Sequence, residues 1–248
     1  MKIKALIPNL FTMLNLFSGC VALVMVADYK FDWAFYFVCL GIFFDFFDGF
    51  FARKFGVAGP LGVQLDSLAD MVTSGLVPGF VMYRLMAFSK EFMSVTVGVG
   101  AFDYYKLYFL GFIITLGACY RLAKFNIDER QSDSFIGLPT PANALFITSL
   151  PLVITAYEHN QQLVELFINK TFLVAITLIS AYVMNAEIPL FSLKIKNFSF
   201  AKYKLQIFFL VLSILLLFFL QILAVPLIII IYVLLSVFNN IVNKKASV

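Results

Sequence analysis

The sequence predicts an all-α, polytopic membrane protein, a single bundle of about eight transmembrane helices. Hydrophobic residues make up 62% of its 248 residues and charged residues only 13%. The mean hydropathy is +0.96. A water-soluble domain of this size could not hide so much apolar surface, which places the chain in the membrane class. Alternating strands separated by regular turns are absent, so the pattern argues against a transmembrane barrel.

The expected spans are apolar runs long enough to cross the hydrocarbon core as helices. They are about 9–28, 33–52, 66–87, 107–124, 141–156, 170–191, 206–222 and 226–242. The fifth run is short. The last two belong to one long apolar stretch, which we divide at Ala224, Val225 and Pro226. No linker or repeat divides the chain, so we expect one domain, with a core of about 1–192 and an extra helix pair of about 205–243.

The distribution of lysine and arginine predicts the orientation, because cytoplasmic loops are enriched in both. With the N-terminus inside, 13 of the 18 basic residues lie on the cytoplasmic side and five on the other. The cytoplasmic set is Lys2, Lys4, Arg53, Lys54, Arg121, Lys124, Arg130, Lys194, Lys196, Lys202, Lys204, Lys244 and Lys245, and the opposite set is Lys30, Arg84, Lys90, Lys106 and Lys170. We therefore expect an integral cell (inner) membrane protein with both termini cytoplasmic. The net charge of +4 reflects this topology and does not indicate nucleic-acid binding.

Two pairs of aspartates interrupt the apolar pattern. Asp45 and Asp48 lie three apart near the cytoplasmic end of the second span, so they share one helix face. Asp66 and Asp70 lie four apart at the start of the third span and again share a face. The topology brings both pairs to the same membrane boundary, where acidic residues mark functional sites by default. We expect the active site at this cytoplasmic boundary.

The charges of these acids predict a metal site. The cations nearest in sequence are Arg53 and Lys54, which cannot neutralise four clustered carboxylates, and burying the excess charge would be costly. Oxygen ligands without histidine or cysteine suit hard divalent cations and not zinc. The chemistry suits Mg²⁺, Mn²⁺ or Ca²⁺, and two such ions, of which we expect Mg²⁺ or Mn²⁺, would balance the four aspartates.

The same residues resemble a known family. The pattern Asp45-x2-Asp48-Gly49-x2-Ala52-Arg53-x8-Gly62-x3-Asp66-x3-Asp70 is similar, at every fixed position, to the signature of the CDP-alcohol phosphotransferases. The segments IPNLFTMLNLFSG (7–19), GVQLDSLAD (62–70), YRLAKFN (120–126) and GLPTPA (137–142) resemble the phosphatidylserine synthase branch. The resemblance covers about the first 145 residues.

This resemblance implies transfer of the phosphatidyl group of CDP-diacylglycerol to L-serine, giving phosphatidylserine and CMP. It implies metal binding by all four aspartates, with Asp70 also acting as the base. It further implies that the protein is a homodimer and that membrane lipids surround it. The positions it implies for CDP-diacylglycerol binding are Asp48, Gly49, Ala52, Arg53 and Gly62. Small residues let the nucleotide approach the backbone, and arginine can donate two hydrogen bonds to phosphate. Asn9 and Thr12, polar in the first span, are further candidates for the same pocket.

The residues that would bind the acceptor alcohol are predicted from charge, with serine taken from the resemblance. Serine is a zwitterion, so its carboxylate needs a cation near the reacting centre. Arg121 and Lys124, one helical turn apart at the end of the fourth span, could supply it, with Asn126 close by. Gln64, two residues before Asp66, could add a neutral contact.

Alternatives remain open at this point. Glycerol phosphate or inositol phosphate would also need cations, so a phosphatidylglycerophosphate or phosphatidylinositol-phosphate type synthase is a second hypothesis. A cation-coupled transporter is a third, but it would place acids near mid-bilayer in repeated halves. Glu187, expected inside the sixth span, could pair with Lys194 or reach the active site.

Overall fold

The computed structural model describes residues 3–88, 107–128, 135–191 and 203–246. Within these ranges the chain is helical apart from short connections and one pair of two-residue strands. Several basic residues used for the orientation lie outside the described residues: Lys2, Lys90, Lys106, Arg130, Lys194, Lys196 and Lys202.

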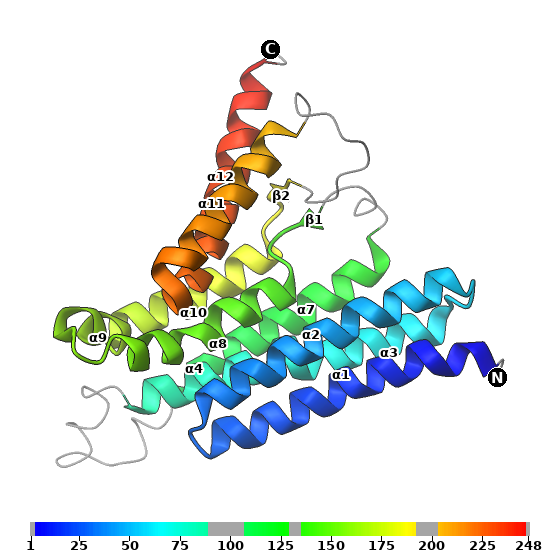
Figure 1. The fold of residues 1–248 in the computed structure, drawn as a ribbon, viewed down its shortest axis with the longest axis horizontal. Helices are drawn as coiled ribbons and strands as arrows, with labels where there is room; N and C mark the ends of the chain where they lie inside the picture. Colours follow the sequence, from blue (N-terminus) through cyan, green and yellow to red (C-terminus); the bar gives the residue numbers. More distant parts are fainter. Residues whose placement is uncertain (1–2, 89–106, 129–134, 192–202, 247–248) are drawn as a thin grey trace.

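The first two helices form an antiparallel hairpin (Figure 1). They are α1 (Ile3–Ala27) and α2 (Phe31–Lys54), joined by a short turn in which Tyr29 has a φ of 61°. The ring of Phe11 lies 5.8 Å from that of Phe47 and 5.3 Å from that of Phe51, so phenylalanines supply part of the contact. Other phenylalanines of α2 point outward; Phe46 is 64% exposed, as a lipid-facing side chain would be.

The third span is one long helix with an irregular middle. It consists of α3 (Pro60–Asp70), the π-helical segment η1 (Met71–Leu76) and α4 (Val77–Phe88). The expected start at residue 66 is wrong, because Gly59 is extended and Pro60 begins the helix at its first turn. Asp66 and Asp70 therefore lie inside the helix and not at its start.

The next helices complete the bundle around this long helix. They are the 3₁₀ segment η3 (Phe109–Phe112), α7 (Ile113–Ile127), α8 (Thr140–Ala156), the short α9 (Gln161–Phe167) and α10 (Lys170–Asn185). The sequence did not predict α9, which meets α10 at a bend of 53°. The expected end of the sixth span at 191 is also wrong: α10 ends at Asn185, and β2 (Pro189–Leu190) then pairs antiparallel with β1 (Phe135–Ile136).

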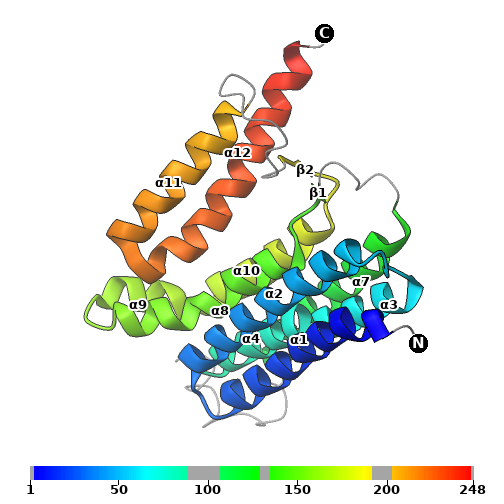
Figure 2. The same ribbon diagram turned by 45° about the vertical axis from the view of Figure 1, so that its right-hand side comes forward.

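The last two helices form a hairpin that projects from the bundle at a steep angle (Figure 2). They are α11 (Lys204–Leu220) and α12 (Ala224–Ala246), separated by the 3₁₀ turn η5 (Gln221–Leu223). The break lies just before the expected division at Ala224, Val225 and Pro226, and Gln221 adopts a φ of 48° there. Tyr232 donates to the carbonyl oxygen of Phe191 (2.9 Å) and Asn240 to that of Pro189 (2.7 Å), which ties α12 to the strand pair.

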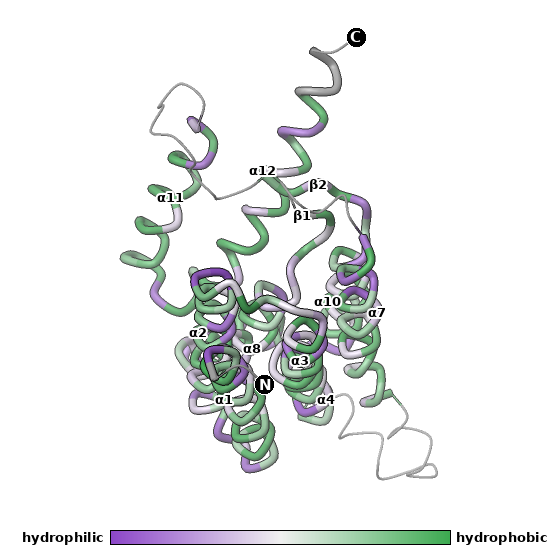
Figure 3. Tube along the Cα trace, turned by 90° about the vertical axis from the view of Figure 1, so that its right-hand side faces the viewer, coloured by the Kyte–Doolittle hydropathy of each residue, from purple (hydrophilic) through white to green (hydrophobic). Residues whose placement is uncertain are grey.

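The helices are long and apolar enough for a membrane protein. By length and composition, five helical stretches among the described residues could cross a membrane, or six if the bent pair α9–α10 is one span. This count treats α11 and α12 as one stretch, Lys204–Val242. It leaves out α8, which is apolar but shorter. Hydrophobic positions predominate along the helices (Figure 3). The structure is thus a membrane helix bundle, as the sequence predicted.

Candidate active site

Three of the four predicted aspartates meet between α2 and α3. Asp45, Asp48 and Asp66 each offer a carboxylate oxygen, and these atoms all lie within 4.8 Å of one another. Asp48 is buried, and Oδ1 of Asp66 is buried without a hydrogen-bond partner. None of the ion pairs among the described residues involves these acids. Buried like charges without a counter-charge are unfavourable, so this group fits a hard divalent cation.

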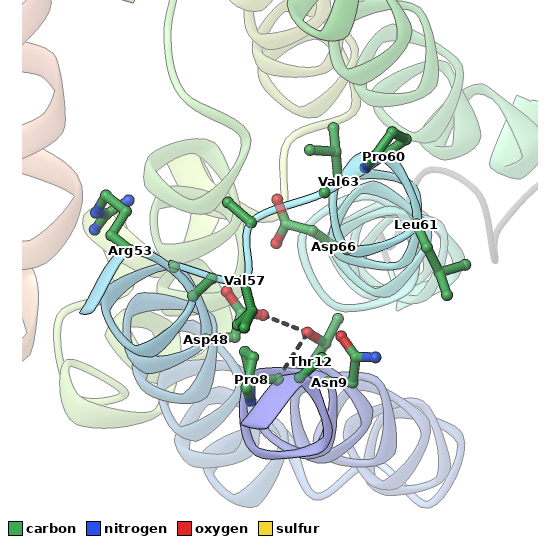
Figure 4. Close-up of a pocket in the computed structure, with 16 residues that line it drawn as sticks. Pro8, Asn9, Thr12, Asp48, Arg53, Val57, Pro60, Leu61, Val63 and Asp66 are labelled. Carbon is green, nitrogen blue, oxygen red and sulfur yellow. Dashed lines mark hydrogen bonds between the residues drawn. The ribbon is translucent and has the colours of Figure 1, made fainter. Parts of the chain in front are cut away.

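Thr12 of α1 supports the second of these carboxylates. Its hydroxyl donates to Oδ2 of Asp48 over 2.7 Å, and it also lies 3.2 Å from the carbonyl oxygen of Pro8 (Figure 4). Thr12 is buried at 3% exposure, so water does not compete for this bond. The contact fixes one oxygen of Asp48 and links α1 to α2.

Asp70 lies near the three-carboxylate group but is not part of it. It is buried, and its Oδ1 accepts a hydrogen bond from Nδ2 of Asn15 over 3.1 Å. It is close enough to Asp66 and Asp48 to be repelled by both, and Arg121 attracts it. The sequence did not single out Asn15 for the site; the available signal was an amide within an otherwise apolar run.

A cavity of about 360 Å³ opens beside the aspartates. All seven residues predicted to bind CDP-diacylglycerol line it: Asn9, Thr12, Asp48, Gly49, Ala52, Arg53 and Gly62. Asp66 lines it too, whereas Asp45 and Asp70 do not. The sequence missed the apolar part of the lining, which includes Ala5, Pro8, Val57, Pro60, Leu61 and Val63. Most of these belong to the turn between α2 and α3 and the start of α3, where the prolines and glycines were the only signal.

Arg53 and the glycines define the wall of this cavity. The guanidinium of Arg53 folds back over Gly49, where a Cβ atom would lie 3.2 Å from Nη1. In Figure 4 the Arg53 side chain points away from Asp48 and Asp66. A Cβ at Gly62 would meet no atom within 4 Å, so that side of the cavity is open.

Among the residues predicted to bind the serine substrate, Arg121 has the most unusual environment. It is 7% exposed, and its Nε and Nη2 atoms are buried without a hydrogen-bond partner. Its guanidinium carbon lies 5.8 Å from the centroid of the Phe125 ring. A buried guanidinium with unpaired N–H groups is costly unless an anion binds it.

Two of the other residues predicted to bind serine, Lys124 and Asn126, have side-chain partners. Lys124 places its Nζ 3.4 Å from Oε1 of Glu187, and Asn126 donates to the hydroxyl of Ser67 over 2.8 Å. The second bond brings the end of α7 against α3, next to Asp66. Gln64 is exposed, and none of the four acceptor candidates lines the cavity.

Glu187 differs from its expected placement. It follows the end of α10 and is not inside a helix, because the chain leaves the helix at Asn185 to reach β2. It pairs with Lys124; the expected partner, Lys194, lies outside the described residues.

Comparison with known proteins identifies the family of the chain. The sequence model of the CDP-alcohol phosphatidyltransferase family matches residues 5–169, a range that contains the aspartates, the cavity lining and Arg121. A CDP-diacylglycerol–serine O-phosphatidyltransferase of Helicobacter pylori is 30% identical over 209 residues, 84% of this chain and 78% of the relative.

Two further relatives come from distant organisms. A Bacillus subtilis protein of the same name is 30% identical over 156 residues, 62% of this chain and 77% of the relative. An archaetidylserine synthase of Methanothermobacter thermautotrophicus is 30% identical over 149 residues, 59% of this chain and 58% of the relative. With the family match over most of the bundle, these similarities show that the chain belongs to the CDP-alcohol phosphatidyltransferase family.

Proposed function

We propose that this membrane protein transfers the phosphatidyl group of CDP-diacylglycerol to L-serine, giving phosphatidylserine and CMP. The observation that carries the proposal is the three-carboxylate group next to a cavity lined by all seven residues assigned to CDP-diacylglycerol. The names of the relatives favour serine as the acceptor over glycerol phosphate or inositol phosphate.

The aspartates would hold divalent cations, Mg²⁺ or Mn²⁺. The donor set fits, because it contains only carboxylate oxygens and one of them is buried without a partner. Asp45, Asp48 and Asp66 form the centre of this site in our proposal, with Asp70 completing it and two ions balancing the four charges. Such ions, when bound, neutralise the pyrophosphate and stabilise charge on the departing CMP.

The protein side chains would then position and activate the two substrates. The cytidine and phosphates lie in the cavity against Gly49, Ala52 and Gly62, and Arg53 turns from the rim to donate to phosphate oxygens. The serine hydroxyl oxygen attacks the phosphorus that carries diacylglycerol. A new P–O bond forms, the bond to the CMP phosphate breaks, and the hydroxyl proton passes to the Asp70 carboxylate.

Serine would bind through its carboxylate to Arg121. Its unpaired Nε and Nη2 suit a two-point contact with a carboxylate, and its attraction to Asp70 would bring the acceptor close to the base. Lys124 and Asn126 form the outer part of this acceptor site, where Glu187 and Ser67 hold them. Gln64 contributes least, because it is exposed and away from the cavity.

We also propose the arrangement in the membrane. Counting α8, the bent pair α9–α10 and both arms of the C-terminal hairpin as spans brings the total to eight, with both termini cytoplasmic in the inner membrane. The start of α1, the end of α2, the start of α3 and the end of α7 lie at one end of the bundle (Figure 1), which we take as the cytoplasmic boundary. The core of about 1–192 would work as a homodimer, with the hairpin of about 205–243 as an addition to it.

A purified-protein assay tests the function. Full-length protein is mixed with CDP-diacylglycerol, Mn²⁺ or Mg²⁺ and radiolabelled serine, beside Asp70→Asn, a no-metal reaction and Asp32→Asn. Asp32 is the matched control because it is exposed at the opposite end of α2. We expect CMP and phosphatidylserine together with wild type and Asp32→Asn, and neither with Asp70→Asn or without metal.

Two results would contradict the proposal in different ways. CMP release with glycerol phosphate or inositol phosphate but not serine would keep the family chemistry and reject the acceptor. No CMP release with any alcohol from folded protein would reject the reaction and leave cation-coupled transport as the leading alternative.

A further inference from the structure

We propose that Asn15 is a positioning residue that orients the Asp70 carboxylate for the transfer reaction, an inference that rests on the proposed function. Asn15 does not line the cavity and belongs to none of the site residues assigned from the sequence. Its side chain nevertheless makes the hydrogen bond that holds Asp70.

The contact is direct and shielded from water. Nδ2 of Asn15 donates to Oδ1 of Asp70 over 3.1 Å, between residues 55 positions apart on α1 and α3. Asn15 is 0% exposed and Asp70 is 7% exposed. With Oδ1 engaged by the amide, Oδ2 is the oxygen left for the attacking hydroxyl.

Asn15 is itself held from a second side. The hydroxyl of Thr73, in the π-helical segment that follows Asp70, donates to the backbone oxygen of Asn15 over 3.0 Å. The segment that contains Asp70 and Thr73 therefore contacts Asn15 twice. Asp70 accepts from its side-chain amide, and Thr73 donates to its backbone oxygen. π-helical turns inside longer helices are frequent at functional sites, where they change the direction of neighbouring side chains.

Glycine makes this close packing possible. A Cβ atom at Gly41 of α2 would lie 2.9 Å from Oδ1 of Asn15 and 2.6 Å from Cγ2 of Thr73. A Cβ at Gly19 of α1 would also collide with the side chain of Thr73. Three helices thus close around the amide, so it has little freedom to change rotamer.

The arrangement parallels the support of the metal-facing acids. Thr12 fixes one oxygen of Asp48 and Asn15 fixes one oxygen of Asp70, both from α1. Removing a side chain that hydrogen-bonds and orients a group at a metal site typically costs about 10- to 100-fold in metal affinity or activity. The difference is that Asn15 orients the acid proposed as the base, whereas the three-carboxylate group forms the centre of the proposed metal site, so loss of Asn15 should affect the chemical step more than metal binding.

The test uses full-length protein in mixed micelles. The variants are Asn15→Ala and Thr73→Val, which remove the two bonds, with Ser18→Ala and Thr73→Ser as controls. Ser18 is a buried hydroxyl one turn along α1 that donates only to its own helix, at the Leu14 carbonyl. We measure kcat and KM for CDP-diacylglycerol, using the alcohol that releases most CMP from wild type, together with the melting temperature and Mn²⁺ binding by titration calorimetry.

We expect Asn15→Ala to lower kcat about 10- to 100-fold, with KM and Mn²⁺ affinity within about threefold of wild type. Thr73→Val should lower kcat by a smaller factor in the same direction, and both controls should match wild type. An unchanged kcat in folded Asn15→Ala would overturn the proposal, as would losses of Mn²⁺ affinity or melting temperature that account for the whole effect. If Asn15→Ala does not fold, Thr73→Val decides by the same criteria. If the wild-type protein prefers another alcohol, serine is rejected as the acceptor, and the proposal for Asn15 is still tested with that alcohol.

Discussion

The hydroxyl of Thr12 on α1 lies 2.7 Å from Oδ2 of Asp48 on α2, at the wall of the cavity that contains the predicted nucleotide-binding residues. The bond joins the first helix to the acidic motif of the second. It also holds one oxygen of Asp48, a member of the group formed with Asp45 and Asp66. The first helix is therefore part of the site and not only part of the bundle.

Replacing Thr12 by valine removes the donor at nearly constant volume. Because a buried carboxylate oxygen loses its partner, we expect kcat/KM for CDP-diacylglycerol to fall about 10-fold or more. Thr12→Ser keeps the hydroxyl and should retain most of the activity. Steady-state kinetics of the two variants check this, and equal losses in both would show that the methyl group, not the hydrogen bond, matters.

Asp66→Asn should separate stability from activity. Removing one of three carboxylates that lie within 4.8 Å relieves repulsion, so the metal-free protein should unfold at a higher temperature than wild type. The gain should be on the order of 1–3 kcal/mol, since two charges near this distance interact by a few kcal/mol at an intermediate dielectric constant. CMP release should be lost. Asp32→Asn is the control, and a lower metal-free melting temperature for Asp66→Asn alone would contradict the charge argument.

Divalent cations should stabilise the wild-type protein. A ligand that binds only the folded state at 100 times its dissociation constant adds about 2.7 kcal/mol to stability. We therefore expect Mn²⁺ or Mg²⁺ to raise the melting temperature and EDTA to reverse the change. Asp66→Asn should respond much less. Thermal unfolding across a metal titration measures both, and an equal rise in the variant would place the bound cation elsewhere.

Arg121→Gln tests recognition of the acceptor carboxylate. Removing one partner of a buried charge pair costs several kcal/mol, so KM for serine should rise about 30-fold or more. Ethanolamine carries the same reacting hydroxyl and ammonium but no carboxylate. We expect ethanolamine to react slowly with wild type, and its rate, followed by CMP release, should be nearly unchanged in the variant. Equal losses with serine and ethanolamine would instead show that Arg121 acts through Asp70 or is needed for folding, and does not bind the serine carboxylate.

Two glycines should respond differently to alanine. At Gly111 a Cβ would lie 2.5 Å from the backbone nitrogen of Tyr83, so η3 and α4 would have to separate. We expect Gly111→Ala to lose about 1–3 kcal/mol of stability and to melt several degrees lower. Gly62→Ala meets no atom within 4 Å and lies in a helix, so it should keep or slightly raise the melting temperature while narrowing the cavity. Scanning calorimetry with an activity assay compares them, and a stable Gly111→Ala would contradict the packing argument.

The sequence by itself determined the features that depend on local pattern. Apolar run length located the main helices, and the break in the last run lies at Gln221–Leu223, next to its expected place. The three- and four-residue spacings placed each aspartate pair on one face of a helix. Short-range periodicity is sufficient for this, because it depends only on helix geometry and on the thickness of the hydrocarbon core.

Only the tertiary structure decided which distant groups meet. It separated Asp70 from the other three acids, gave it Asn15 as a partner and paired Lys124 with Glu187. These contacts join residues more than 50 positions apart, and no local pattern encodes them. They depend on how closely the helices approach, which small residues such as Gly41 permit and which becomes defined only when the helices pack.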